Sequence, residues 1–510
     1  MQPTVAAATL CQKSFIPHTL DHTTTGDPNN PLLESNGAGL AINDLDNDGL
    51  LDIVLANLDG SNAIFWNQGR LQFRKETLAH GDSRSVAIVD TDGDGWLDIV
   101  FTRRRLASPV LWLNLRGVGE PAFKMTEPFG DHGAYSMAWA DLDGDNDLDL
   151  VTAAYDVEQE KIEKAQPLLR GQGVIYYENI DNIFTPTQLI ELSQALAILL
   201  LDLNGDRRLD ILVGNDFHHP DQLWLRQADG WDLTQIFSTI TQNTMSLDAG
   251  DLDNDGQMEI FAADMKPYPD EPMDAWLPMM TNMVHDPFEN DPQIMANVLQ
   301  VRAASGQFED GAVDRGIDGT GWSWSSKFGD LNNDGFLDLY VVNGMLDPNL
   351  FGQLPDHELV EENQAFQNDG TGHFTPAPHW GLNVTTGGRS MSMADLDNDG
   401  DLDVVVNNYM SSAQLFENQL CTGRSLAVDL AWPESRNTRA IGARIMLHTS
   451  TGTYQRTVRS NSGYLSGDPA RVHFGLPEES KLIRLTIEWP DGAISTVSQL
   501  SAQTIMTISR

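Results

Sequence analysis

The chain has 510 residues, of which 41% are hydrophobic, and its 74 acidic side chains outnumber its 31 lysines and arginines. The formal net charge of -43 and the isoelectric point near 4.3 argue against electrostatic binding to a nucleic-acid backbone or to an anionic membrane surface. No apolar run approaches the ~20 residues that span a bilayer, so we expect no transmembrane segment.

The chain begins with MQPTVAAATLCQKSF, which has no basic n-region and too short an apolar core for a secretory signal. We therefore expect that a signal peptide is not present in this chain. A short strand is expected over residues 12–20, where Phe15 follows a turn.

The first strong motif is DLDNDGLLD, residues 44–52, which places four aspartates in nine positions. Carboxylates this close repel one another unless a cation neutralises them, and aspartates at positions one, three and five of a glycine-containing turn offer the hard oxygen ligands that Ca²⁺ prefers. An EF-hand would need a glutamate at position twelve and a helix on each side. Position twelve is Leu55, and both flanks have the pattern of strands, so the loop closes at Asp52.

The motif occurs seven times, with copies starting at Asp44, Asp90, Asp141, Asp202, Asp251, Asp330 and Asp395. By analogy with known calcium loops, we expect side-chain ligands at positions one, three, five and nine, with both oxygens of position nine, and a backbone carbonyl at position seven. The candidate ligands are Asp44, Asp46, Asp48, Leu50, Asp52; Asp90, Asp92, Asp94, Trp96, Asp98; Asp141, Asp143, Asp145, Asp147, Asp149; Asp202, Asn204, Asp206, Arg208, Asp210; Asp251, Asp253, Asp255, Gln257, Glu259; Asp330, Asn332, Asp334, Phe336, Asp338; and Asp395, Asp397, Asp399, Asp401, Asp403.

Position six is glycine in five copies, which suits a left-handed backbone. Asn146 tolerates that geometry, whereas Arg207 adopts it poorly and adds positive charge. Together with the neutral Asn204, this predicts that the loop starting at Asp202 is the weakest of about seven calcium sites.

Each copy lies within a repeat of four expected strands. An alternating strand precedes the loop, a second follows it, a third carries an aromatic residue and usually a polar end, and a fourth starts at Phe73, Phe123, Phe184, Trp231, Phe308 or Phe374. This pattern predicts an all-β fold, a seven-bladed β-propeller over residues 1–421. Insertions interrupt it at residues 154–172, 264–296 and 344–361.

The last repeat lacks its fourth strand, and residues 12–20 resemble the fourth-strand segments elsewhere, so we expect them to complete blade seven. The only two cysteines, Cys11 and Cys421, then flank the missing turn, which predicts a disulfide; two buried free thiols are the alternative. A disulfide implies an oxidising compartment.

From Thr422 the aspartate loops cease and five or six strands follow, which predicts a small β-sandwich over residues 422–510. The order IGAR, GYLS, HFGL, WPDG within residues 441–492 resembles the ASPIC/UnbV domain, and the upstream loops resemble integrin-type FG-GAP/VCBS repeats. The whole chain is similar to the cartilage acidic protein family and its bacterial homologues. This resemblance implies a secreted, calcium-loaded protein of adhesion or matrix type.

The expected function is therefore an extracytoplasmic calcium-binding module, at the cell surface, in the periplasm or secreted. It would act as a monomer and bind an extracellular protein or glycan; nucleic acid is not an expected partner. Searches for catalytic motifs find none, so we expect no enzyme. The alternatives are a polysaccharide-processing enzyme on a propeller, to which His218 and His219 could contribute, and a purely structural matrix or envelope protein.

Overall fold

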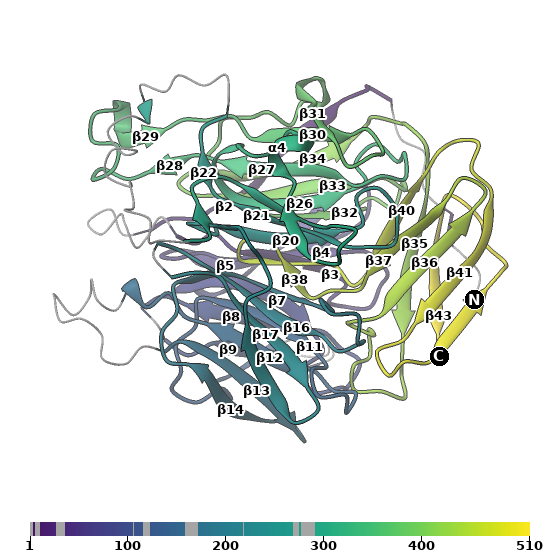
Figure 1. Ribbon diagram of the computed structural model, residues 1–510, viewed down its shortest axis with the longest axis horizontal. Helices are drawn as coiled ribbons and strands as arrows, with labels where there is room; N and C mark the ends of the chain where they lie inside the picture. The colour runs from purple at the N-terminus through teal and green to yellow at the C-terminus, as the bar shows by residue number, and fades with distance from the viewer. Residues whose placement is uncertain are drawn as a thin grey trace.

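The computed structural model describes residues 4–5, 11–26, 36–105, 107–115, 123–158, 172–217, 219–268, 275–276 and 291–510 (Figure 1). Nearly all regular structure in these residues is β, which confirms the expected fold class. His218, residues 159–171 of the first expected insertion and most of the second lie outside the described residues. No helix in the described part of the chain is long and apolar enough to cross a membrane.

Within the described residues, seven sheets share one antiparallel order of four strands. Their first strands are β3 (Leu40–Asn43), β7 (Ser83–Val89), β11 (Ser136–Ala140), β15 (Ala195–Leu201), β20 (Ser246–Gly250), β26 (Gly321–Gly329) and β32 (Gly388–Ala394). Their second strands are β4 (Asp52–Leu55), β8 (Asp98–Arg103), β12 (Asp149–Ala153), β16 (Asp210–Asn215), β21 (Glu259–Ala263), β27 (Asp338–Asn343) and β33 (Asp403–Asn408). Each second strand therefore begins at position nine of an aspartate loop.

The outer two strands complete each sheet. The third strands are β5 (Ser61–Asn67), β9 (Val110–Asn114), β13 (Val174–Ile180), β17 (Gln222–Gln227), β24 (Val298–Arg302), β30 (Gln364–Asn368) and β34 (Ser412–Asn418). The fourth strands are β6 (Phe73–His80), β10 (Phe123–Thr126), β14 (Ile183–Ile190), β18 (Gly230–Thr234), β25 (Phe308–Asp310), β31 (Phe374–Pro376) and β2 (Phe15–Thr23). The aromatic residues expected to start the fourth strands lie in the first two positions of these elements.

The sheets are arranged in a closed ring. The first strand of each sheet contacts the first strand of the next along the chain, and β32 contacts β3 again. Almost every residue of these first strands is buried, because neighbouring sheets cover both of their faces. The N-terminal β2 pairs with β34, with Phe15 opposite Asn418, so the two ends of the ring meet in one sheet. The disulfide Cys11–Cys421 joins the same two segments, with Cα atoms 5.5 Å apart.

The C-terminal residues form two further four-stranded sheets, which lie to one side of the ring (Figure 1). One contains β1 (Thr4–Val5), β43 (Thr504–Ser509), β35 (Arg424–Ala431) and β40 (Val472–Leu476). The other contains β37 (Thr453–Thr457), β36 (Arg444–Thr449), β41 (Leu482–Glu488) and β42 (Ile494–Val497). The first sheet recruits the N-terminal residues 4–5, which the sequence had assigned to the propeller.

A hairpin of the C-terminal part, β38 (Asn461–Ser462) and β39 (Ser466–Gly467), enters the ring. β39 pairs in parallel with β3, and the hairpin contacts the first strands of the other sheets. Residues 460–467 are all buried. At the tip, the Tyr464 hydroxyl lies 2.5 Å from the Tyr135 hydroxyl. The boundary expected between residues 421 and 422 therefore separates two sequence patterns but does not separate the chain in space.

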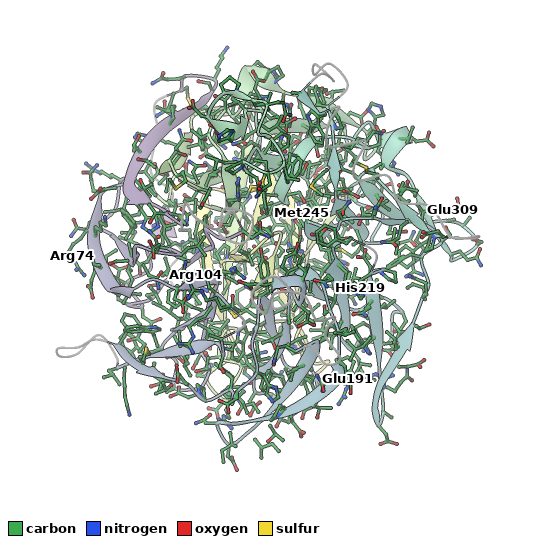
Figure 2. All side chains as sticks on the ribbon, turned by 90° about the vertical axis from the view of Figure 1, so that its left-hand side faces the viewer. Arg74, Arg104, Glu191, His219, Met245 and Glu309 are labelled. Carbon is green, nitrogen blue, oxygen red and sulfur yellow. A yellow bond between two sulfur atoms is a disulfide. The ribbon has the colours of Figure 1, made fainter. Side chains whose placement is uncertain are left out.

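The remaining elements are short. They are the pairs β19 (Ile240–Thr241) with β23 (Gln293–Ile294) and β28 (Met345–Leu346) with β29 (Glu358–Leu359), β22 (Met265–Lys266) beside β26, α4 (Ala312–Arg315), and the 3₁₀ turns η2 (Pro355–His357) and η3 (Pro378–Trp380). Figure 2 shows the ring from the side opposite to the sandwich, with Met245 and Arg104 toward its middle and Arg74 and Glu309 at its rim.

Candidate metal centre

Each aspartate loop winds around the carboxylate at its first position. In the first loop, the Asp48 N–H donates to Asp44 Oδ1 at 3.1 Å and the Gly49 N–H donates to Asp44 Oδ2 at 2.9 Å. The Leu50 N–H donates to Asp48 Oδ1 at 2.8 Å. This wrapping turns the side chains at positions one, three and five inward, and a left-handed Gly49, with φ of 90°, allows the turn.

The inward turn brings carboxylates together. In five loops, three acidic side chains each offer an oxygen within 4.8 Å of the others. The groups are Asp44, Asp46, Asp48; Asp90, Asp92, Asp94; Asp141, Asp143, Asp149; Asp251, Asp253, Asp255; and Asp395, Asp397, Asp399. In the other two loops an asparagine stands at position three, and its amide donates to the position-five carboxylate, from Asn204 to Asp206 at 3.1 Å and from Asn332 to Asp334 at 2.9 Å.

The acidic residue at position nine has a second role that the sequence did not reveal. Asp52 is buried, and its two oxygens accept the N–H of Leu45 at 3.1 Å and of Asn67 at 2.8 Å. Equivalent bonds hold Asp98, Asp149, Asp210, Asp338 and Asp403. Glu259 accepts one such bond, from Leu252. Position nine thus ties the loop to the third strand, and its ligation of calcium stays a prediction.

Burial, with mutual repulsion as a smaller cause, raises the pKa values of several of these carboxyl groups. Desolvation raises the pKa of Asp52 to about 8, and the same cause, with Asp397 and Asp399 nearby, raises the pKa of Asp395 to about 8. Desolvation also raises the pKa of Asp44 and of Asp141 to about 6. Such groups ionise at neutral pH most readily beside a cation.

The donor set fits Ca²⁺. The clusters consist of carboxylate and amide oxygens, the hard ligands that calcium takes in groups of six to eight. Asp251 Oδ1 at position one of its loop, and Asp147 Oδ1 and Asp401 Oδ1 at position seven of theirs, are buried without a hydrogen-bond partner in the described structure. A buried oxygen without a partner lowers the stability of the folded chain unless a cation or a water molecule contacts it.

Two departures at position six behave as expected. Asn146 has φ of 74° and Arg207 has φ of 69°, so both adopt the left-handed conformation that glycine occupies in the other loops. A left-handed residue with a side chain costs roughly 1–2 kcal/mol. Arg207 adopts this conformation despite its side chain, and its guanidinium pairs with Glu488 of the sandwich at 3.1 Å.

Position four is a feature that the sequence analysis missed, although it is asparagine or glycine in every copy. All seven of these residues have positive φ: Asn47, Gly93, Gly144, Gly205, Asn254, Asn333 and Asn398. Three of the asparagines also donate to the position-six carbonyl of the next loop, at 3.2 to 3.3 Å. The loops are therefore linked to one another as well as to their own strands.

The polar end of the third strand provides another link between sheets. Asn67 donates from Nδ2 to the carbonyl of Leu51 in its own loop and to that of Leu396 in the preceding loop. Asn114, Asn368 and Asn418 make the same pair of bonds, and Asn179 makes the bond to its own loop. In the fifth sheet Arg302 reaches the carbonyl of Leu203 instead.

The sandwich lies against the loop face of the ring. Arg471 bridges the last and first loops, donating to Asn398 Oδ1 at 3.0 Å and to the Gly49 carbonyl at 3.1 Å. Thr438 donates to Asp90 Oδ2 at 2.5 Å, and Arg436 pairs with Asp147 at 3.1 Å. The C-terminal part therefore places hydrogen-bond donors and positive charge on the acidic ring.

His219, which the enzyme alternative invokes, is half-buried on the side of the ring away from the sandwich (Figure 2). Trp322 and Trp324 are buried; Trp322 packs on Phe351 and Trp324 on Tyr464.

Comparison with known proteins supports this description. Residues 433–510 match the family model described as ASPIC and UnbV, and residues 44–101, 90–152, 202–262 and 354–406 match the model described as FG-GAP-like repeat. No curated protein matches the chain.

Similar solved structures include rhamnogalacturonan lyase YesW, with 12% identity over 80% of this chain and 76% of that one and a TM-score of 0.38. They also include the V. cholerae biofilm matrix protein Bap1, with 12% identity over 96% of this chain and 64% of that one and a TM-score of 0.32. A third is the WD40 domain of Toxoplasma gondii coronin, with 10% identity over 81% of this chain and 89% of that one and a TM-score of 0.40. Scores this low carry no argument about this chain. From the family models and the loops together, the chain carries FG-GAP-like repeats followed by an ASPIC/UnbV domain.

Proposed function

We propose that the chain is an extracytoplasmic binding module whose ring is stabilised by calcium ions, about seven, one in each aspartate loop. The convergence of three acidic oxygens within 4.8 Å in five separate loops is the observation that carries this proposal. A single acidic cluster would be weak support, but such clusters recur in loops that occupy the same place in five of the seven sheets, with Asp149 at position nine replacing position five in the third loop.

The proposed role of calcium is structural. Bound in a loop, the ion would supply positive charge to carboxylates that otherwise repel one another. The chain's own residues do the rest: position one organises the loop backbone, and position nine anchors the loop to the third strand. Because the site does not exist in the unfolded chain, binding energy becomes folding energy.

The disulfide Cys11–Cys421 supports placement outside the cytosol, since such bonds persist in oxidising compartments. We further propose membership of the cartilage acidic protein family and a monomer that binds an extracellular protein or glycan. The proposal assigns no catalysis to the chain, since residues 460–467 occupy the middle of the ring, where propellers often hold their sites.

The test is thermal unfolding in EGTA and in 10 mM CaCl₂, with bound calcium counted by elemental analysis. For extracellular sites with Kd of ~10⁻⁴ to 10⁻³ M, linkage predicts about 1.4–2.7 kcal/mol from each occupied site. An unchanged melting temperature would remove the proposal. Magnesium serves as the control ion, because it demands tighter octahedral geometry and should stabilise less.

Single-loop variants test the ranking of sites. Asp395→Asn removes a ligand from a loop with four acidic ligand positions, whereas Asp202→Asn removes one from the loop that contains Asn204 and Arg207. We expect Asp395→Asn to lower the calcium-dependent part of the stability more. Equal losses in the two variants would contradict the prediction that the loop at Asp202 is the weakest.

A further inference from the structure

A cleft of about 400 Å³ lies between the third and fourth aspartate loops and the sandwich. Four arginines line it: Arg207, Arg208 and Arg226 from the fourth sheet, and Arg444 from β36. The chain has only 31 lysines and arginines against 74 acidic residues, so this is a local concentration of positive charge on an acidic molecule.

The repeats serve as an internal reference for these arginines. Arg226 occupies the place that asparagine takes in five other sheets, because its N–H makes the same bond to the closing carboxylate, Asp210, at 2.8 Å. Four of those asparagines link two loops, whereas in the described part of the chain the Arg226 side chain makes no such link; its guanidinium lies 4.9 Å from the centre of the Trp231 ring. Arg226 therefore places a positive charge in the lining of the cleft, whereas the asparagines at this position in other sheets hold the loops in place.

Arg207 is a departure as well, and Arg208 follows it at position seven, which varies from loop to loop. Arg207 holds a left-handed conformation that glycine adopts without strain in five of the loops. Its side chain is 65% exposed and that of Arg208 is 45% exposed, so neither arginine serves core packing. Two changes from the repeat pattern thus occur in one sheet, and together with Arg208 they line one cleft.

The positive and negative charges of the cleft lining do not cancel once calcium occupies the loops. Glu488 is shared between Arg207, at 3.1 Å, and Arg444, whose Nε lies 3.0 Å away, so one carboxylate faces two guanidinium groups. Arg208 pairs with Asp206 at 2.6 Å. The other acidic groups of the lining are Asp141, Asp143 and Asp202, which are candidate calcium ligands. This step rests on the proposed function: with one calcium ion in each loop, the four carboxylates of the lining, Glu488 included, face four guanidinium groups and two divalent ions, so the lining itself is net positive.

We propose that this cleft binds a short oligosaccharide that carries carboxylate or sulfate groups. Guanidinium groups recognise both anions through paired hydrogen bonds. The volume lies in the range of small-ligand sites and is too small for a protein face. Between the arginines, the lining includes the half-buried Leu209, Met258 and Pro490, against which the C–H faces of sugar rings can pack.

The experiment is isothermal titration calorimetry of the full chain in 10 mM CaCl₂. The probes are trigalacturonate, sulfated maltotriose, inorganic sulfate at low millimolar concentration and neutral maltotriose. We expect one or both anionic saccharides to bind, which identifies the preferred group, and neutral maltotriose not to bind. Binding of inorganic sulfate as tight as that of both saccharides would overturn the assignment to a saccharide.

The double variant Arg226→Gln/Arg444→Gln should weaken saccharide binding at least tenfold. Arg74→Gln is the matched control, because Arg74 lies at the rim of the ring and pairs with Glu76 (Figure 2). Equal affinity of the double variant and the control would overturn the proposal.

Two results separate this proposal from the one on which it rests. Loss of saccharide binding in EGTA, with recovery on adding calcium, supports the charge argument. If the melting temperature rises with calcium but neither anionic saccharide binds, the proposal that the cleft binds a saccharide is overturned and the calcium proposal stays intact.

Discussion

Tyr464, at the tip of the hairpin that enters the ring, offers a direct test of how the two parts of the chain are joined. Its side chain is fully buried, its hydroxyl meets that of Tyr135 at 2.5 Å, and its ring lies 5.1 Å from that of Trp324. We expect Tyr464→Phe to leave the buried Tyr135 hydroxyl without this partner, at a cost of about 1–3 kcal/mol.

Tyr464→Ala should cost more, about 3–5 kcal/mol, because it also leaves a cavity in a packed aromatic cluster. Tyr135→Phe should cost about the same as Tyr464→Phe, but the double variant should cost less than the sum, since no hydroxyl is then left alone. The expected coupling is about 1 kcal/mol.

The assay is equilibrium denaturation by guanidinium in excess calcium, followed by tryptophan fluorescence. Tyr177→Phe is the control partner: Tyr177 is equally buried in the third sheet but its hydroxyl makes no described bond to the hairpin, so its effect should add to that of Tyr464→Phe. Additivity within about 0.3 kcal/mol for the Tyr464 and Tyr135 pair would refute the placement of the hairpin.

Three further predictions concern ring closure. Serine in place of Cys11 and Cys421 removes a crosslink between residues 410 apart and should cost about 2–4 kcal/mol; an unchanged melting temperature would contradict this. Burial lowers the pKa of His22 from 6.5 to about 4. The contribution of His22 to folding stability is therefore fully present above pH 6.5 and is lost as the pH falls toward 4, because over this range the unfolded chain binds a proton that the folded chain does not. Between pH 7 and pH 5 the wild type should therefore lose about 2 kcal/mol more than His22→Gln in denaturation experiments, and parallel losses would refute the argument. Asn418→Ala removes the amide donor from the carbonyls of Leu331 and Leu402 and should cost about 1–3 kcal/mol by the same method, whereas a loss under about 0.5 kcal/mol would show that water replaces the amide.

The aspartate loops could be found from the sequence because each is a local structure. Nine consecutive residues contain the candidate ligands, and a glycine or asparagine marks every left-handed position except that of Arg207, so neither depends on distant contacts. The same holds for the strands on each side, whose alternating pattern is set by their own residues. The asparagines at position four and at the third-strand end were visible in the sequence, but their roles were not, because their acceptors lie in neighbouring repeats.

The sequence by itself determined the all-β class, the repeat, the positions of the acidic loops and the pairing of the two cysteines. Only the tertiary structure decided that residues 460–467 lie inside the ring, that residues 4–5 join the C-terminal sheet, and that Arg226 and Arg444 line one cleft. The physical reason is range: a loop is specified by neighbours along the chain, whereas these contacts join segments hundreds of residues apart whose meeting depends on how the whole ring closes.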